Sequence, residues 1–536
     1  MFKYFLMHYF HFFIYLVLGL VLFFFYKIGL FFKLFKTVKE NLFFFIILFV
    51  AAAAIALRCF PSEPLIYYDE HNYLLHAQNI VEHNANALCN AAADGRCASF
   101  GIAPHGLGLS SVQALFYDYD FHDFYRKLSF LNLLFYLLNS LLIFIIAVCL
   151  FPDKNIARIS SVLILAVPYN MIYATNVMPA TMMNTLLLAA VFGFIRLVES
   201  RESGFSVSAF GALICTLILM ASIRIEYILL LTFLLMATVW RAVQCLKNGC
   251  FKIRLDRKAI IRRMTQTASL GAAVFLIYSY AFFYKAMKYA SSEARVGLDH
   301  LNFSYIQYYF SNPGFWILSM GFFAYLIYFL RSLFKRGELP EKTIKAFLFL
   351  LFFFFIGFYS FFSFAAVYRF TVPATSIYVL FATAGMVLLL KFLKNKTALN
   401  AASVIIVLAV CVFLVADAFK EKRRLVKWNR HNAEFLDIIQ QDNLDDISKE
   451  FKGENYYYFK APYLGQISRL GNYSDDYHRA VEKLISGSNL FYLENPFERI
   501  SGSLFKDKKF FSHQLVYKEP RSGYRIYKID LKADDE

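Results

Sequence analysis

Pro64-Leu65-Ile66-Tyr67-Tyr68-Asp69-Glu70-His71-Asn72-Tyr73-Leu74-Leu75-His76-Ala77 is the stretch around which the chain is organised. It places two adjacent acids, Asp69 and Glu70, just after an apolar run, near the start of a long polar loop at about residues 58–127. Asp is a favoured helix N-cap and apolar residues follow at helical spacing, so a structural helix start explains Asp69 without catalysis. A carboxylate at a helix start can also face a cavity, which leaves a catalytic interpretation open. Adjacent residues do not share a helix face, so we expect Asp69 to face the reacting group and Glu70 to support the site or bind an acceptor.

The composition excludes an ordinary soluble domain. Of the 536 residues, 59% are hydrophobic, and the chain contains 63 Phe and 36 Tyr at a mean hydropathy of +0.50. A membrane-spanning helix needs about 20 mostly apolar residues. The apolar runs of about this length in the chain predict a membrane all-α bundle of about 12 spans. They lie near residues 8–26, 42–57, 128–150, 159–177, 180–197, 207–223, 225–243, 267–285, 313–331, 345–365, 371–390 and 398–416. The first span has no cleavage site after it, which favours a retained anchor over a removable signal.

The net charge of +17 does not indicate nucleic-acid binding, because Lys and Arg cluster in short breaks between apolar runs. Counting the spans puts the basic breaks on one side, which the positive-inside rule assigns to the cytoplasm. The loop at 58–127 and the turn at Asn176 then face outward, as does the chain after residue 416. A basic run from Lys420 to Arg430 follows the last span, and by the charge rule alone it would be cytoplasmic. We expect a multi-pass protein of the bacterial cytoplasmic (inner) membrane, with the active site and the C-terminal domain on the extracytoplasmic side.

The C-terminal segment predicts a separate small domain. We divide the chain into a transmembrane domain, residues 1–416, and an α/β soluble domain, residues 417–536. The expected elements are a helix over His431–Phe451, strands at Tyr456–Phe459 and Leu490–Leu493, a helix from Ser474 through Leu484, and a hairpin of Gln514–Tyr517 with Tyr524–Tyr527. No metal, nucleotide or nucleophile motif is found in it.

Ionisable residues inside apolar stretches are costly, so they usually pair or line a polar pathway. Arg224 and Glu226 interrupt two apolar runs and can be explained as a structural pair. Arg369 has no acid near it in the sequence, which favours an external anion such as a phosphate. In the outer loop at 286–312, Arg295 is a further candidate anion contact, although an ordinary solvated loop explains it equally well.

Other polar residues of the outer loop are less specific. A second surface helix is predicted to begin at Pro104, which places His105 at its edge, where a lone His is more often structural than catalytic. Cys89 and Cys97 would form a local disulfide if the loop faces an oxidising compartment, and are otherwise two free thiols. A stripe of Asn72, His76, Asn79 and His83 is explained by a solvated polar face as well as by a divalent metal site. We therefore assign no metal ligands and no certain cofactor, and we leave a divalent metal open.

Together these segments make the chain resemble the polytopic glycosyltransferases of the GT-C fold, in particular the protein O-mannosyltransferases and the lipid A aminoarabinose transferases. The similarity rests on Tyr68-Asp69-Glu70-His71-Asn72-Tyr73, on Ala103-Pro104-His105-Gly106, on Ser222-Ile223-Arg224-Ile225-Glu226 and on Tyr368-Arg369-Phe370-Thr371-Val372-Pro373. It covers roughly residues 40 to 390. The chain departs from the pattern at Val177-Met178-Pro179-Ala180, where many relatives carry an acid, so a second carboxylate is not carried over.

The resemblance implies transfer of a sugar from a polyprenyl-phosphate donor to a hydroxyl of a glycan, lipid or protein acceptor. Asp69 would act as the general base with inversion at the anomeric carbon. The candidate donor-phosphate contacts are Arg369, Arg295, His105 and Arg224. The apolar groove between spans would hold the prenyl tail. The expected partners include membrane lipids and no nucleic acid.

Two alternatives remain from the sequence. A transporter or flippase of lipid-linked sugars explains the spans and the buried arginines, but it does not require a large outer loop that begins with adjacent acids, and no inverted repeat of interrupted spans is found. A polysaccharide polymerase or ligase would place its chemistry in the loop at 286–312, around Arg295 and His300.

Overall fold

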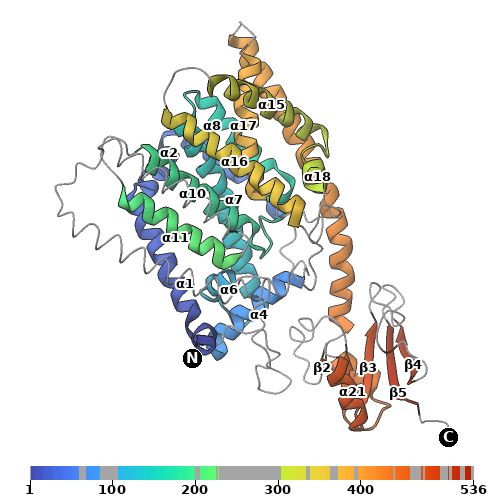
Figure 1. Ribbon diagram of the computed structural model, residues 1–536. Coiled ribbons are helices and arrows are strands. Elements are labelled where there is room, and N and C mark those ends of the chain that lie inside the picture. Colours follow the sequence, from blue (N-terminus) through green and yellow to red (C-terminus); the bar gives the residue numbers. More distant parts are fainter. Residues whose placement is uncertain are drawn as a thin grey trace, which may run out of the picture.

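The computed structural model is a helical bundle joined by one long helix to a small β-sheet (Figure 1). It describes residues 2–59, 68–84, 107–199, 206–224, 227, 303–333, 339–362, 372–391, 396–438, 441–458, 473–474, 477–494, 505, 510–518 and 525–532. The bundle helices are α1 (Phe2–Lys27), α2 (Leu30–Glu40), α3 (Leu42–Cys59), α4 (Tyr68–His83), α6 (Leu107–Ala114), α7 (Phe121–Leu150), α8 (Lys154–Ala166), α9 (Pro168–Ile172), α10 (Pro179–Glu199), α11 (Val207–Ile223), α14 (Ser304–Tyr308), α15 (Pro313–Leu333), α16 (Leu339–Phe362), α17 (Val372–Leu390) and α18 (Lys396–Ile438).

Six of the described helices are long and apolar enough to cross a membrane: Tyr9–Lys27, Asp123–Leu150, Pro179–Glu199, Pro313–Leu333, Val372–Leu390 and Ala401–Arg423. A bent pair, Leu30–Glu40 with Leu42–Arg58, meets at 95° and raises the number to seven if it is one span. The chain is therefore a membrane protein, and six of the predicted spans are confirmed as apolar helices. A total of twelve is not confirmed. The predicted spans at 225–243 and 267–285 lie outside the described residues, apart from residue 227.

The prediction of one continuous span over 159–177 is wrong. Helix α8 ends at Ala166, and α9 begins at Pro168 and is only 5 residues long. Proline has no backbone N–H to donate and disfavours helical geometry at the residue before it. Val167 accordingly has φ −58° and ψ 126°, outside the helical region. The chain then continues as a non-helical segment, Tyr173–Met178, to α10.

The centre of the bundle is formed by α7, α8, α10 and α17, and almost every residue of α10 and α17 is buried. Buried hydroxyls join α7 to α8, where Ser140 and Ser161 each donate to the other's carbonyl at 2.9 and 3.0 Å. Helices α15 and α17 approach closely because glycines face each other. A Cβ on Gly321 would overlap the carbonyl oxygen of Ala382.

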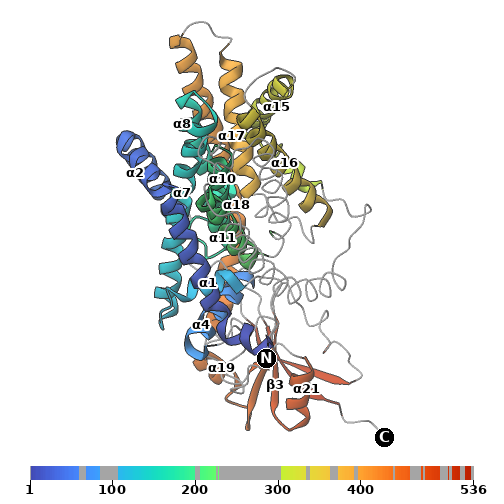
Figure 2. The ribbon, with the colours of Figure 1, turned by 60° about the vertical axis from the view of Figure 1, so that its left-hand side comes forward.

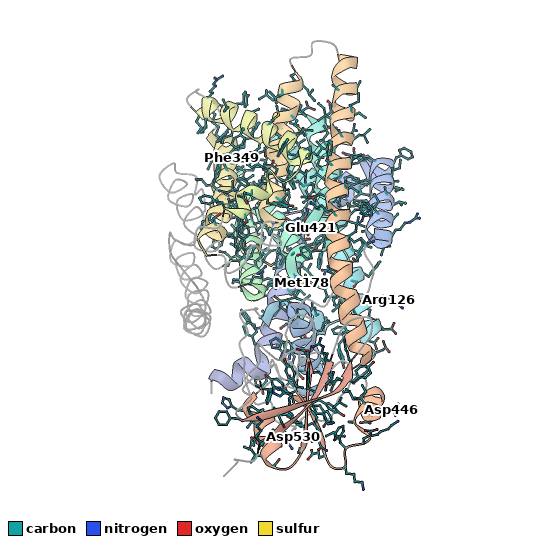
Figure 3. The ribbon with its side chains drawn as sticks, turned by 90° about the vertical axis from the view of Figure 1, so that its right-hand side faces the viewer. Arg126, Met178, Phe349, Glu421, Asp446 and Asp530 are labelled. Atoms are coloured by element: carbon teal, nitrogen blue, oxygen red, sulfur yellow. The ribbon has the colours of Figure 1, made fainter. Side chains whose placement is uncertain are left out.

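Helix α18 runs for 43 residues out of the bundle and toward the sheet (Figures 1 and 3). Its sequence contains neither Gly nor Pro from Lys396 to Ile438, so nothing local interrupts it, and 43 residues span about 65 Å. The basic run Lys420–Arg430 lies inside this helix rather than in a loop. The sheet and the short helices α4 and α6 lie at the same end of the bundle in both views (Figures 1 and 2).

The C-terminal sheet has the order β2-β1-β3-β5-β4, with β1 parallel to β2 and β3, and β5 antiparallel to β3 and β4. Its strands are β1 (Asn455–Tyr458), β2 (Tyr473–Ser474), β3 (Asn489–Glu494), β4 (Phe511–Lys518) and β5 (Arg525–Leu531), and its helices are α19 (Gln441–Ser448) and α21 (Tyr477–Ile485).

The two strands, the second helix and the closing hairpin predicted for this domain are confirmed. The single helix predicted over 431–451 is wrong, because α18 occupies its first part and α19 is separate. Helix α21 packs on the face that carries Tyr456 and Tyr458. Ser448 at the end of α19 lies 3.0 Å from the hydroxyl of Tyr457 on the other face. Both faces of β1 are therefore covered.

Candidate active site

The non-helical segment Tyr173–Met178, here the buried loop, is wholly inside the protein. A buried loop must find partners for its backbone groups. Three neighbouring helices supply them. Asn132 of α7 donates to the carbonyls of Asn176 and of Met178, the latter at 3.3 Å, and Gln113 of α6 donates to the carbonyl of Val177 at 3.2 Å. The hydroxyl of Thr181 on α10 donates to the carbonyl of Tyr173 at 2.9 Å. The loop is thus fixed by two side-chain amides and a hydroxyl in place of a helical ladder.

The buried loop connects two parts of the bundle that are far apart in the sequence. On one side, Val177 packs in a cluster with Leu74, Ala77 and Ile80 of α4. On the other side, Tyr173 and Met178 pack with Val372, the first residue of α17, and with Ala418 of α18. Figure 3 shows Met178 close to α18, in the part of the bundle that lies toward the sheet. The loop therefore joins the helix of the acidic pair to the start of α17.

Asp69 and Glu70 are the second and third residues of α4. The predicted helix after the acidic pair is confirmed, and its apolar residues Tyr73, Leu74 and Ala77 are buried. Only the backbone of the two acids is described, so their catalytic roles remain predictions. The first turn of a helix carries backbone N–H groups without intrahelical partners, and negative charge is stabilised there.

The polar stripe of α4 is not a solvated face. His76 and Asn79 are 1% and 0% exposed. The interpretation of the whole stripe as solvated is therefore wrong. No group of three or more His, Cys, Asp or Glu side chains with metal-binding geometry occurs within the described ranges. The side chains of Asn72 and His83 lie outside them.

The C-terminal end of α4 is tied to the segment after α6. Tyr117 donates its hydroxyl hydrogen bond to Glu82, which also accepts from Gln78 at 3.1 Å. Burial and, secondarily, the neighbouring Glu82 carboxylate raise the pKa of Tyr117, so its hydroxyl stays a donor at physiological pH. This contact fixes how α4 lies against α6.

Arg224 comes to the same end of the bundle. It is the C-cap of α11, with its backbone N–H on the carbonyl of Met220 at 2.9 Å, and it is half-buried. The end of α11 touches α6 at a glycine. A Cβ on Gly108 would overlap the Ser222 hydroxyl and lie 2.8 Å from the Ser222 carbonyl carbon. Only glycine permits this approach, which brings Arg224 near the helix that follows His105 in the chain.

The remaining candidates lie outside the described residues. These are His105, Arg295, Arg369, Cys89, Cys97, Glu226 and His300. The predicted phosphate contacts, the Arg224–Glu226 pair and the disulfide therefore remain predictions.

Sequence reasoning missed the residues that hold the buried loop: Asn132, Gln113 and Thr181. A signal for Asn132 was present, because it is an amide within a predicted span, and intramembrane polar residues usually face the bundle interior. Asn139, two turns further along α7, follows the same rule. It donates to the carbonyl of Thr181 at 3.4 Å and accepts from Thr185 at 2.8 Å.

Comparison with solved structures identifies the fold. The chain is similar to the oligosaccharyltransferase of Archaeoglobus fulgidus tethered with an acceptor peptide, with a TM-score of 0.51 and 12% identity over 92% of this chain and 74% of that one. It is also similar to the same organism's oligosaccharyltransferase AglB in complex with an inhibitory peptide and a dolichol-phosphate, with a TM-score of 0.52 and 11% identity over 91% and 74%.

A third similar structure is apo ArnT from Cupriavidus metallidurans, with a TM-score of 0.51 and 13% identity over 90% of this chain and 97% of that one. No protein-family model matches the chain, and no curated protein matches it significantly. The chain therefore has the fold of the GT-C glycosyltransferases, which confirms the resemblance at the level of the fold.

Proposed function

We propose that the chain is a glycosyltransferase that moves a sugar from a polyprenyl-phosphate donor to an acceptor hydroxyl, with Asp69 as the general base. The observation that carries this proposal is the docking of α4 on the buried loop, because the same loop packs on Val372 at the start of α17. Leu74 lies about 7.5 Å along α4 from Asp69, at 1.5 Å per residue. Arg369 precedes Val372 by three residues, so their Cα atoms are at most about 11 Å apart. Both predicted groups thus belong to segments that meet at one loop.

The chemistry follows from the types of these two groups. The Asp69 carboxylate would accept the proton of the acceptor hydroxyl as its oxygen attacks the anomeric carbon. The bond between the anomeric carbon and the phosphate oxygen breaks, and the lipid phosphate leaves with its charge. A guanidinium forms bidentate hydrogen bonds with phosphate, which suits Arg369 to hold the donor and the leaving group. Attack opposite the leaving group inverts the anomeric centre.

The fold supports the donor and acceptor classes. A structure of AglB, with the same fold, contains a dolichol-phosphate and an inhibitory peptide, and another contains a tethered acceptor peptide. A lipid-linked donor and a glycan, lipid or protein acceptor are therefore the first classes to test on this chain. The fold does not select among sugars.

Charge supports an extracytoplasmic site. Two basic residues lie at the bundle end away from α4, whereas the basic run Lys420–Arg430 of α18 lies toward the sheet (Figure 1). Lys33 lies 3.0 Å from the Cys149 sulfur near the end of α7, and Lys391 lies 3.6 Å from Asp153 at the start of α8. Cys149 is about 31 Å along α7 from Leu128, which packs beside α4. By the positive-inside rule the basic end is cytoplasmic, which puts α4 and the C-terminal sheet outside, in a bacterial cytoplasmic membrane by this proposal.

The test is transfer by the purified protein in lipid nanodiscs. A panel of polyprenyl-phosphate sugars is offered with glycan, lipid and peptide acceptors, and the glycosylated product is detected by mass spectrometry. We expect product with one donor class, and Arg369→Ala should weaken donor binding at least tenfold, with partial recovery in Arg369→Lys. If proteoliposomes move the intact lipid-linked sugar across the bilayer and make no product, the chain is a transporter and the proposal is wrong. Unchanged donor affinity in Arg369→Ala would remove the phosphate role.

A further inference from the structure

Asn176 is an unusual residue of the buried loop. It is fully buried, and neither its side-chain nitrogen nor its side-chain oxygen has a hydrogen-bond partner among the described residues. A buried amide without partners carries its full desolvation cost, so native proteins rarely keep one without a reason. Elsewhere in the part of the chain that the structure describes, asparagines with an unmatched atom keep a partner for the other. Asn184, for example, accepts from Ser376 at 2.6 Å.

Three further polar atoms without a partner among the described residues lie on α6 and α7 within one turn of Gln113 or Asn132, the two residues that donate to the loop from these helices. They are the hydroxyls of Ser110 on α6 and Ser129 on α7, and the amide oxygen of Gln113. The amide nitrogen of Gln113 donates to the loop carbonyl of Val177, and Ser110 lies one turn before Gln113 on α6. Ser129 lies one turn before Asn132, which donates to the Asn176 carbonyl. We call Ser110, Gln113, Ser129 and Asn176 the neutral polar cluster.

The cluster lies beside the helix of the proposed base. Val177, the next residue after Asn176, packs on Leu74 and Ala77 of α4, and Leu128, the residue before Ser129, belongs to the same group of side chains. The cluster therefore lies where α4, α6, α7 and the buried loop meet. By the proposed function, the donor sugar binds at this junction, beside the helix that carries the base.

The chemistry of the cluster favours one kind of ligand. Hydroxyls and amides are neutral groups that donate and accept, and each hydroxyl of a sugar also donates and accepts. None of the four side chains of the cluster supplies a counter-charge to a charged group bound against them, which is costly in a buried site. We propose that the neutral polar cluster binds the hydroxyls of the donor sugar and selects an uncharged sugar over amino sugars and sugar acids. This inference rests on the proposed transferase function and adds the substrate class to it.

The first test separates ligand binding from a structural role. Asn176→Ala removes two unmatched buried polar atoms, so the protein should remain as resistant to thermal unfolding as the wild type, or more so. Transfer from the preferred donor should nevertheless fall, by roughly tenfold in kcat/KM for each sugar hydrogen bond lost. A structural asparagine would behave in the opposite way, with lower thermal stability and a loss of activity that follows the fraction unfolded.

The chain offers a matched control. Ser129→Ala and Ser160→Ala remove the same atom from two buried helical serines, both with unmatched hydroxyls. Ser160 lies on α8, far from the cluster. Its neighbour Ser161 donates to the carbonyl of Ser140 on α7. Ser140 is about 16 Å along α7 from Ser129. We expect Ser129→Ala to lower transfer and Ser160→Ala to leave it unchanged. Equal effects of the two substitutions would contradict the inference.

The second test uses the donor. In the wild type, a monodeoxy donor that lacks the hydroxyl bound by Asn176 should react roughly tenfold more slowly than the parent. The same deletion should cost little in Asn176→Ala, because its partner is already gone. Additive losses at every hydroxyl, or preferred transfer of an amino sugar or uronic acid by the wild type, would overturn the inference while leaving the transferase proposal intact. Absence of any transfer by the wild type would instead reject the transferase itself.

Discussion

Replacing Asn132 by leucine tests whether the buried loop is held as the structure indicates. The Asn132 amide donates to the carbonyls of Asn176 and Met178, and Asn132 is 6% exposed, so water does not replace it. Leaving a buried acceptor without its donor costs about 1–3 kcal/mol. Two carbonyls would cost up to about 6 kcal/mol, but the bond to Met178 is long at 3.3 Å, which places the expected loss at about 2–4 kcal/mol.

The assay is reversible unfolding in bicelles together with donor turnover. Asn132→Leu should lose about 2–4 kcal/mol and at least tenfold in kcat/KM, because the loop carries Asn176 and supports α4. Asn139→Leu is the matched control. It lies two turns along the same helix, is also buried, and contacts the Thr181 carbonyl and the Thr185 hydroxyl of α10 rather than the carbonyls of the loop. It should lose stability while the folded fraction keeps its turnover. Two results would refute this account of the loop. One is a stability of Asn132→Leu within about 0.5 kcal/mol of that of the wild type. The other is a turnover per folded molecule of Asn132→Leu that is no lower than that of Asn139→Leu.

Two further predictions concern the close helix contact and the sidedness. Gly108→Ala should destabilise the protein by about 1–3 kcal/mol in thermal unfolding, because the added methyl group overlaps Ser222. Adding Ser222→Gly should restore part of this loss. A Gly108→Ala protein as stable as the wild type would mean that α6 and α11 do not approach as described. Cysteines introduced at the exposed Leu115 and Leu515 should react with an impermeant maleimide from the same side of sealed vesicles, and one at Lys391 from the opposite side, after subtraction of labelling of the unmodified chain. Labelling of Leu115 and Leu515 positions from opposite sides would contradict the common outer placement.

The sequence predicts those elements whose local signal is also what stabilises them. Long apolar runs identify α7, α10, α15 and α17, since a membrane span is defined by length and composition. The C-terminal strands were found because β-branched and aromatic runs bounded by turn residues favour strands. The same logic failed at 159–177, where hydropathy continues across Pro168 but the backbone cannot. Hydropathy also ended the last span at residue 416, whereas helicity continues through the basic run of α18 to Ile438.

The site was predicted only in part. The helix after Asp69 follows from periodicity, but the burial of His76 and Asn79 depends on segments from elsewhere in the chain. Periodicity cannot show that the polar side of an amphipathic helix is covered by other segments. The contacts of Asn132 and Gln113 with the loop span 44 to 64 residues and follow from the tertiary arrangement alone.

The most direct test of the central claim is the turnover and donor affinity of Asp69→Asn. Asparagine has nearly the same size but cannot accept the proton of an acceptor hydroxyl, and a positioned general base contributes about 10²–10⁴ in rate. We predict a folded protein that binds the polyprenyl-phosphate donor within about twofold of the wild type and transfers its sugar at least about 100-fold more slowly. Glu70→Gln, the neighbouring control, should lose much less. Transfer by Asp69→Asn at a rate close to that of the wild type would contradict the account.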